Sequence, residues 1–250
     1  MMFANAENAL RSDIVQRITT HAANRPRALQ TEVGCSALGT LCDRKLGYML
    51  LGTQKFRTGD NTGWMASIGT AVHAWLETIF ADTDEYMSEV PVVVNYGKIQ
   101  IPGTVDLYSK QHKTVIDFKV VGESTLAAAR AGRISRQYSV QVQLYGLGLQ
   151  QAGYRVEKVA IMFLPRNREL ADAVLWETPY DTGLAKLAID RYRNISYAIK
   201  LAGESALPEL AVEDAPCTWC DYFNPAAKEL AKGCPGAPLT TIKPSTNERK

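Results

Sequence analysis

The stretch VIDFKV, residues 115–120, places an acid and a base two positions apart within a short apolar run. Because side chains alternate across a β-strand, Asp117 and Lys119 share one face, and Ile116, Phe118 and Val120 share the other. Taken alone, this pattern is also typical of a solvated outer face that carries a weak ion pair. The flanking sequence must distinguish a solvated face from a functional site.

The segments around this stretch predict a mixed α/β fold. Runs rich in β-branched residues at 89–94, 98–108 and 114–121 predict a strand meander, and GTAVHAWLETIF at 69–80 predicts an amphipathic helix before it. After the meander, the patterns predict helices at 123–131, 139–152 and 181–202 and strands at 156–163 and 171–178. We therefore expect a mixed central sheet flanked by helices.

Composition is that of an ordinary globular chain. The 28 Lys and Arg residues against 26 Asp and Glu give a net charge of +2, so any nucleic-acid-binding surface must be local. No apolar run approaches the roughly 18 residues of a membrane span, and the N-terminus lacks the pattern of a secretory signal. We expect an intracellular protein that does not bind membranes.

The five cysteines indicate a metal centre. Their number is odd, and three of them, Cys217, Cys220 and Cys234, lie close together in the C-terminal segment. In an intracellular chain this usage favours metal ligation over a disulfide framework. By ligand type alone, a set of four thiolates fits either zinc or an iron–sulfur cluster.

A second group of residues suits a hard cation. His73 lies on the predicted helix, with Glu77 one turn later as a possible outer group, and Asp106 ends the strand IPGTVD. If the strands of Asp106 and Asp117 are neighbours, both carboxylates can reach one cation beside Lys119. Each residue also has an ordinary explanation, as a core-edge histidine, a solvated glutamate or a strand-ending aspartate.

The ordered motifs GTAVHAWLE, IPGTVD, VIDFK and QVQLY resemble those of the PD-(D/E)XK nuclease superfamily, in its RecB-like branch. The matching pairs are Gly69 and His73, Gly103 and Asp106, Asp117 and Lys119, and Gln141 and Tyr145. The resemblance implies a restriction-endonuclease-like fold. It also implies a DNA exonuclease that hydrolyses phosphodiester bonds with Mg²⁺ or Mn²⁺.

The resemblance also implies roles for individual residues. The divalent ion would be held by His73, Asp106, Asp117 and the main-chain carbonyl of Phe118. Lys119 would orient or deprotonate the attacking water. Gln141 and Tyr145, which lie one turn apart, would contact nucleic acid or support the site.

Three arginines precede the QVQLY helix at a spacing of three. Arg130, Arg133 and Arg136 are typical of a solvated helix face. Beside a nuclease site they would also be suitable phosphate contacts.

The stretch CDRKLGYML, residues 42–50, resembles the start of the iron–sulfur subgroup of the same branch. There, one N-terminal cysteine joins three C-terminal ones around a [4Fe-4S] cluster, which implies the ligands Cys42, Cys217, Cys220 and Cys234. Zinc remains an alternative metal, and Cys35 an alternative to Cys42. The implied organisation is an N-terminal helical segment (1–65), a nuclease core (66–202) and a Pro-rich C-terminal segment (203–250), with the two ends forming a small helical iron–sulfur subdomain.

Members of this subgroup act on single-stranded DNA ends in recombination, repair and phage DNA metabolism. The resemblance therefore implies DNA as the partner and the cytoplasm of a bacterium or phage-infected host as the location, and it is compatible with a helicase or recombination partner and with self-association. Two other classes stay open. One is a non-catalytic DNA- or partner-binding module with a structural cluster, and the other is a zinc or redox iron–sulfur protein unrelated to nucleic acid.

Overall fold

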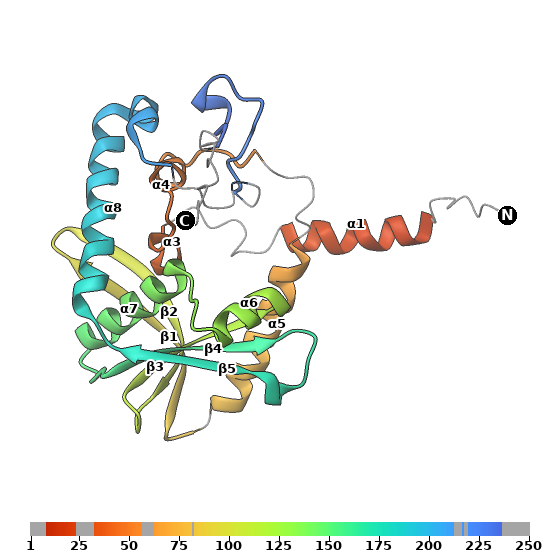
Figure 1. Cartoon of the computed structure of the whole chain (residues 1–250), viewed down its shortest axis with the longest axis vertical. Helices are drawn as coiled ribbons and strands as arrows, with labels where there is room; N and C mark the ends of the chain where they lie inside the picture. The colour runs from red at the N-terminus through yellow and green to blue at the C-terminus, as the bar shows by residue number, and fades with distance from the viewer. Residues whose placement is uncertain are drawn as a thin grey trace, which may run out of the picture.

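The computed structural model describes residues 9–23, 33–56, 63–81, 83–212, 217 and 220–236 (Figure 1). Its elements follow one another along the chain in the predicted order of helix, three strands, helices, two strands and helix. They are α1 (Ala9–Ala23), α3 (Cys35–Leu38), α4 (Asp43–Leu50), α5 (Trp64–Phe80), β1 (Tyr86–Tyr96), β2 (Ile99–Ser109), β3 (Thr114–Val121), α6 (Glu123–Arg130), α7 (Arg136–Gln151), β4 (Lys158–Pro165), η1 (Leu170–Asp172), β5 (Val174–Pro179), α8 (Thr182–Ala202), η2 (Gly203–Glu209) and η4 (Leu230–Lys232).

The five strands form one mixed sheet in the order β1-β2-β3-β4-β5. All neighbouring strands are antiparallel except β3 and β4, which are parallel. A parallel pair needs a crossover connection, and α6 and α7 supply it. The predicted mixed sheet flanked by helices is confirmed, and it is consistent with a restriction-endonuclease-like fold.

Capping residues explain where the helices begin. Ser135 precedes α7 and its side chain accepts a hydrogen bond from the Tyr138 amide, so the helix starts at Arg136, earlier than the predicted position 139. Asp181 caps α8 in the same way, through the amides of Gly183 and Leu184. The predicted strand at 171–178 is wrong at its start, because Leu170–Asp172 forms a 3-10 turn and β5 begins after it.

The β1–β2 hairpin has a register set by its turn. Its ladder closes with Tyr96 opposite Ile99, which leaves two residues in the turn, and Gly97 there has a φ of 62°. Glycine adopts this conformation at low cost, and two-residue turns of this kind fix the pairing of both strands. The same register places Glu89 directly across from Asp106.

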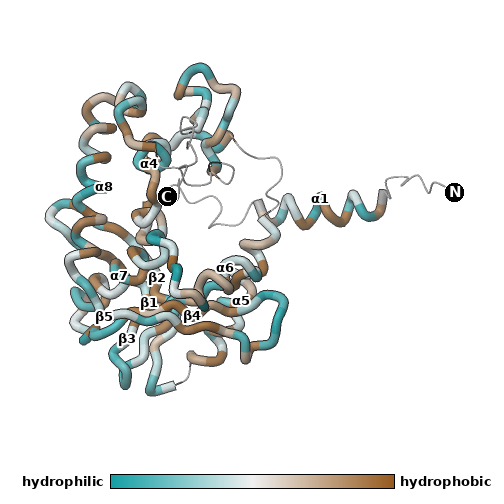
Figure 2. Tube along the Cα trace, viewed as in Figure 1, coloured by the Kyte–Doolittle hydropathy of each residue, from teal (hydrophilic) through white to brown (hydrophobic). Residues whose placement is uncertain are grey.

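Helices pack on the two faces of the sheet through separate apolar clusters. On one face, Leu76 of α5 packs with Phe118 of β3. On the other face, Leu144 of α7 packs in the larger core with Val115 of β3. Helix α8 carries both apolar and polar residues along its length (Figure 2), and Ile189, Ile195 and Ile199 are among its buried side chains. None of the helices in the described ranges has both the length and the apolar character to cross a membrane.

The N-terminal and C-terminal segments meet at α4. The Tyr48 ring stacks on Tyr222 with ring centroids 5.0 Å apart, and the Tyr48 hydroxyl donates a 2.7 Å hydrogen bond to the Leu230 carbonyl. Arg44 donates a 3.0 Å hydrogen bond to the carbonyl of Leu207. Figure 1 shows the blue C-terminal segment beside α4, as these contacts require.

Candidate active site

The candidate site lies where strands β2 and β3 separate. The β2–β3 ladder ends at the pair Leu107 and Ile116, and beyond it Asp106 and Asp117 occupy facing positions. Glu89 of β1 lies across from Asp106 on the other side. Three carboxylates therefore form a row across three adjacent strands.

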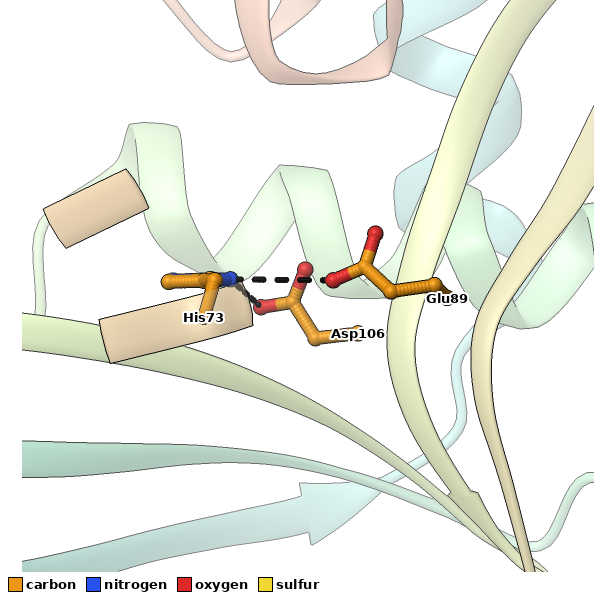
Figure 3. Close-up of side chains that lie close together, drawn as sticks. All are labelled: His73, Glu89 and Asp106. Carbon is orange, nitrogen blue, oxygen red and sulfur yellow. Dashed lines mark ion pairs between the residues drawn. The ribbon is translucent and has the colours of Figure 1, made fainter. Parts of the chain in front are cut away.

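His73 of α5 reaches this row. Its Nδ1 atom lies 3.6 Å from Asp106 Oδ2 and 3.9 Å from Glu89 Oε1 (Figure 3). Within the described part of the chain, one group of three or more His, Cys, Asp or Glu residues has ligand atoms that all lie within 4.8 Å of one another. This group consists of His73, Glu89 and Asp106. Carboxylate oxygens with an imidazole suit Mg²⁺ or Mn²⁺, so this group could bind such an ion.

The main chain of Phe118 holds two of these side chains in place. Its amide donates a 2.7 Å hydrogen bond to Asp106 Oδ2, and its carbonyl oxygen lies 3.1 Å from His73 Nε2. When Nε2 carries the proton, this contact is a hydrogen bond that leaves the lone pair of Nδ1 facing the carboxylates. The Phe118 carbonyl oxygen could also act as a ligand to a divalent ion beside His73.

Asp106 and His73 have perturbed titration. Burial, followed by the negative charge of Asp117, raises the pKa of Asp106 to about 7. Glu89 raises the pKa of His73 through its hydrogen bond, while burial opposes that rise. Without a cation, Asp106 is therefore costly to ionise, and a divalent ion would offset this cost.

The geometry of Asp117 and Lys119 shows that they are not a solvated surface pair. Asp117 is 1% exposed, and the Lys119 ammonium lies 2.6 Å from its Oδ2 atom. Gln141 donates a 2.9 Å hydrogen bond to Oδ1 and accepts a 3.3 Å hydrogen bond from Lys119. Oδ2 is buried, and the Lys119 ammonium is its partner among the described residues.

Helix α7 supplies the support behind Asp117. Gln141 and Tyr145 are both buried, and the Gln141 amide donates a 2.8 Å hydrogen bond to the Tyr145 hydroxyl. Burial and the charge of Asp117 raise the pKa of Tyr145, which keeps this hydroxyl protonated. A Cβ atom at Gly103 would lie 2.9 Å from Tyr145 Cε1 and 2.9 Å from Cys35 Sγ. The absence of a side chain at Gly103 therefore leaves room for Tyr145 and Cys35.

Glu89 was missed by the reasoning from sequence. Glu89 lies in the apolar run EVPVVV. The one feature that could have revealed it is the hairpin register set by the Gly97 turn, which places Glu89 opposite Asp106. Its φ of 47° is unusual for a residue other than glycine, and such strain often occurs at functional sites. Glu77, considered as an outer group, is instead exposed on α5 and outside the cluster of His73.

The four predicted cluster cysteines line one cavity. Cys42, Cys217, Cys220 and Cys234 all contribute to a cavity of about 450 Å³ between α4, the first turn of α7 and the C-terminal segment. Among described residues, no three of their sulfur atoms lie within 4.8 Å of one another. Cys35 is buried against Gly103, where burial raises its pKa to about 12, and it is not among the described lining residues.

Comparison with known proteins gives a likeness in fold. No family model and no curated protein matches the chain. The structure of SSO0001 is similar with a TM-score of 0.51 at 15% identity, covering 85% of this chain and 94% of that one. A phage-related exonuclease from Haemophilus somnus 129PT has a TM-score of 0.44 at 14% identity, covering 66% and 92%. LHK-Exo, an alkaline exonuclease from Laribacter hongkongensis, has a TM-score of 0.46 at 10% identity in its complex with dAMP, covering 70% and 95%. The likeness to SSO0001 concerns the fold alone.

Proposed function

We propose that the protein is a divalent-metal-dependent nuclease that hydrolyses phosphodiester bonds in DNA, working from single-stranded ends. One observation carries the proposal: an imidazole, three carboxylates and an ammonium group converge where the sheet opens. They are His73, Glu89, Asp106, Asp117 and Lys119. Four of them, His73, Asp106, Asp117 and Lys119, follow one another in the order of the RecB-like motifs.

The residues fit Mg²⁺ or Mn²⁺. His73, Asp106, Asp117 and the Phe118 carbonyl would hold the ion as predicted, and Glu89 joins them as a further oxygen ligand. The Lys119 ammonium beside Asp117 and the raised pKa of Asp106 both favour a site that binds positive charge. When bound, the cation supplies Lewis-acid polarisation of the scissile phosphate.

Lys119 lies where its ammonium group can act on the attacking water. Asp117 and Gln141 fix its ammonium group at the edge of the carboxylate row, where it can orient the attacking water or take part in its deprotonation. Gln141 is a positioning residue, because it contacts Lys119, Asp117 and Tyr145 and holds all three in one arrangement.

Cleavage of end-labelled oligonucleotides tests the proposal. Single strands labelled at the 5′ or 3′ end, a circular single strand and a duplex are incubated with the protein and Mn²⁺, with EDTA as control. We expect metal-dependent shortening of linear single strands that Asp117→Asn and Lys119→Met abolish and the exposed control Glu77→Gln leaves intact. Full activity of both site variants, or cleavage that continues in EDTA, would contradict the assignment.

We also propose that Cys42, Cys217, Cys220 and Cys234 hold a [4Fe-4S] cluster. A tetrahedral zinc ion with Zn–S bonds near 2.3 Å places its sulfurs about 3.8 Å apart. The resemblance to the iron–sulfur subgroup favours a cluster, in which each thiolate binds a different iron atom. Such a cluster would link α4 to the C-terminal segment. A brown protein that contains iron and sulfide is expected, and a colourless protein with stoichiometric zinc would refute the cluster.

The cellular setting follows from the same proposal. We infer action in the cytoplasm of a bacterium or a phage-infected host. A helicase or recombination partner and self-association stay predictions.

A further inference from the structure

Two cavities adjoin at the start of α7. The cavity that the cysteines line extends to Arg136 and Tyr138, and a second cavity of about 260 Å³ is lined by Arg133. Thr125, Ser135 and Tyr138 line both. Together these five residues define a surface shared by the two cavities, the basic groove.

The basic groove carries two arginines that form no ion pair with any described residue. Arg133 and Arg136 are exposed, neither has an acidic partner among the described residues, and no described acidic residue lines either cavity. Arg130, the third arginine of the series, differs because it forms a 2.9 Å ion pair with Asp172. Helix α7 also begins here, and the positive end of its dipole adds to the charge.

Tyr138 connects the basic groove to the candidate active site. The Lys119 ammonium lies 5.1 Å from the centre of the Tyr138 ring, and the same ring borders both cavities. An aromatic ring in a basic groove is a stacking platform for an unpaired base, since every base has a flat face and needs no particular sequence. In a duplex, these faces are covered by neighbouring base pairs.

We propose that the basic groove is the path by which a single DNA strand enters the active site. Arg133 and Arg136 contact successive phosphates, Tyr138 stacks on one base, and the next phosphodiester comes to Lys119. This inference rests on the proposed nuclease function for its active-site end. It assigns a substrate form, single-stranded over duplex, to residues that the metal site does not include.

Equilibrium binding in EDTA tests the groove without cleavage. Fluorescence anisotropy with a labelled 15-nucleotide single strand is measured for the full-length protein at several salt concentrations. The double variant Arg133→Ala/Arg136→Ala should bind roughly tenfold or more weakly and lose about 1.4 from the slope of log K against log salt, at about 0.7 for each lost contact with a single strand. Arg130→Ala, the matched control, should keep the affinity and slope of the wild type.

The stacking role is tested in the same assay. Tyr138→Leu should weaken single-strand binding about 5- to 150-fold, while Tyr138→Phe, which keeps the ring, should bind as the wild type does. A duplex of the same sequence should bind more weakly and should respond little to Tyr138→Leu. Circular dichroism of each variant confirms folding.

The outcomes separate the groove from the nuclease. Wild-type affinity and salt slope in the folded arginine double variant, unchanged binding by Tyr138→Leu, or equal binding of duplex and single strand would each overturn the groove. The expected binding pattern supports the groove even in a protein that fails to cleave DNA with Mn²⁺, a failure that would count against the nuclease function alone.

Discussion

Replacing Asp106 with asparagine should make the metal-free protein more stable while abolishing activity. Burial and the nearby Asp117 raise the pKa of Asp106 from its ordinary value of 3.8 to about 7. At about 1.4 kcal/mol for each tenfold change, ionising Asp106 in the folded protein costs up to roughly 4 kcal/mol. Asparagine removes this charge and still accepts the hydrogen bond from the Phe118 amide. Asp106→Asn also loses the attraction between Asp106 and His73, which offsets part of the gain. The expected net increase in the free energy of unfolding is about 2–4 kcal/mol.

The pH dependence has a definite sign. Because the pKa of Asp106 is higher in the folded state, the unfolded chain loses its proton first as the pH rises. Ionisation of Asp106 therefore lowers the free energy of unfolding progressively between about pH 4 and pH 7, and this loss is constant above that range. Thermal unfolding in EDTA at pH 8 should show Asp106→Asn melting about 5–10 °C above the wild type, with the difference vanishing near pH 4.

Two variants control this experiment. Glu77→Gln removes an exposed acid from α5 and should not change the melting temperature. Asp117→Asn should lower the melting temperature, because it leaves the Lys119 ammonium without its partner at 2.6 Å. A lower melting temperature for Asp106→Asn than for the wild type at pH 8, in EDTA, would refute the reasoning about the carboxylate row.

Four further changes test neighbouring parts of the account. Glu89→Gly should relieve the strain of a φ of 47° and stabilise the metal-free protein by about 1 kcal/mol, yet weaken Mn²⁺ binding measured by calorimetry; tighter Mn²⁺ binding would exclude Glu89 as a ligand. Gly103→Ala should cost about 1–3 kcal/mol in urea unfolding, because its Cβ would collide with Tyr145, and a neutral result would contradict the packing. Gln141→Leu should lower kcat by at least tenfold with little change in KM, whereas an effect on KM alone would assign Gln141 to substrate binding. Cys42→Ser should lose the visible absorbance of the purified protein, and retention of colour by this variant would remove Cys42 from the cluster.

The sequence predicted the sheet because its strands differ clearly in pattern from the helices. The alternation in VIDFKV correctly placed Asp117 and Lys119 on one face, and their contacts with Gln141 follow from that face being covered by α7. Helix and strand starts were less accurate. The starts depend on local contacts, such as the Ser135 cap, which the pattern of apolar residues does not reveal.

The site was only partly predictable for a similar reason. His73 and Asp106 could be paired from the order of the motifs, and the structure places them 3.6 Å apart. Glu89 required the exact register of a hairpin, which a two-residue turn sets and no motif marks. The ion pair of Arg130 with Asp172 joins residues 42 positions apart, so the sequence could not separate Arg130 from its two neighbours.

The central claim is that one divalent ion sits where His73 and the carboxylate row meet. Anomalous scattering from a crystal grown with Mn²⁺ measures this directly. We expect a strong peak bounded by His73, Glu89 and Asp106 in the wild type that is lost in Asp106→Asn. A wild-type crystal with no peak there, or with manganese only at exposed surface carboxylates, would contradict it.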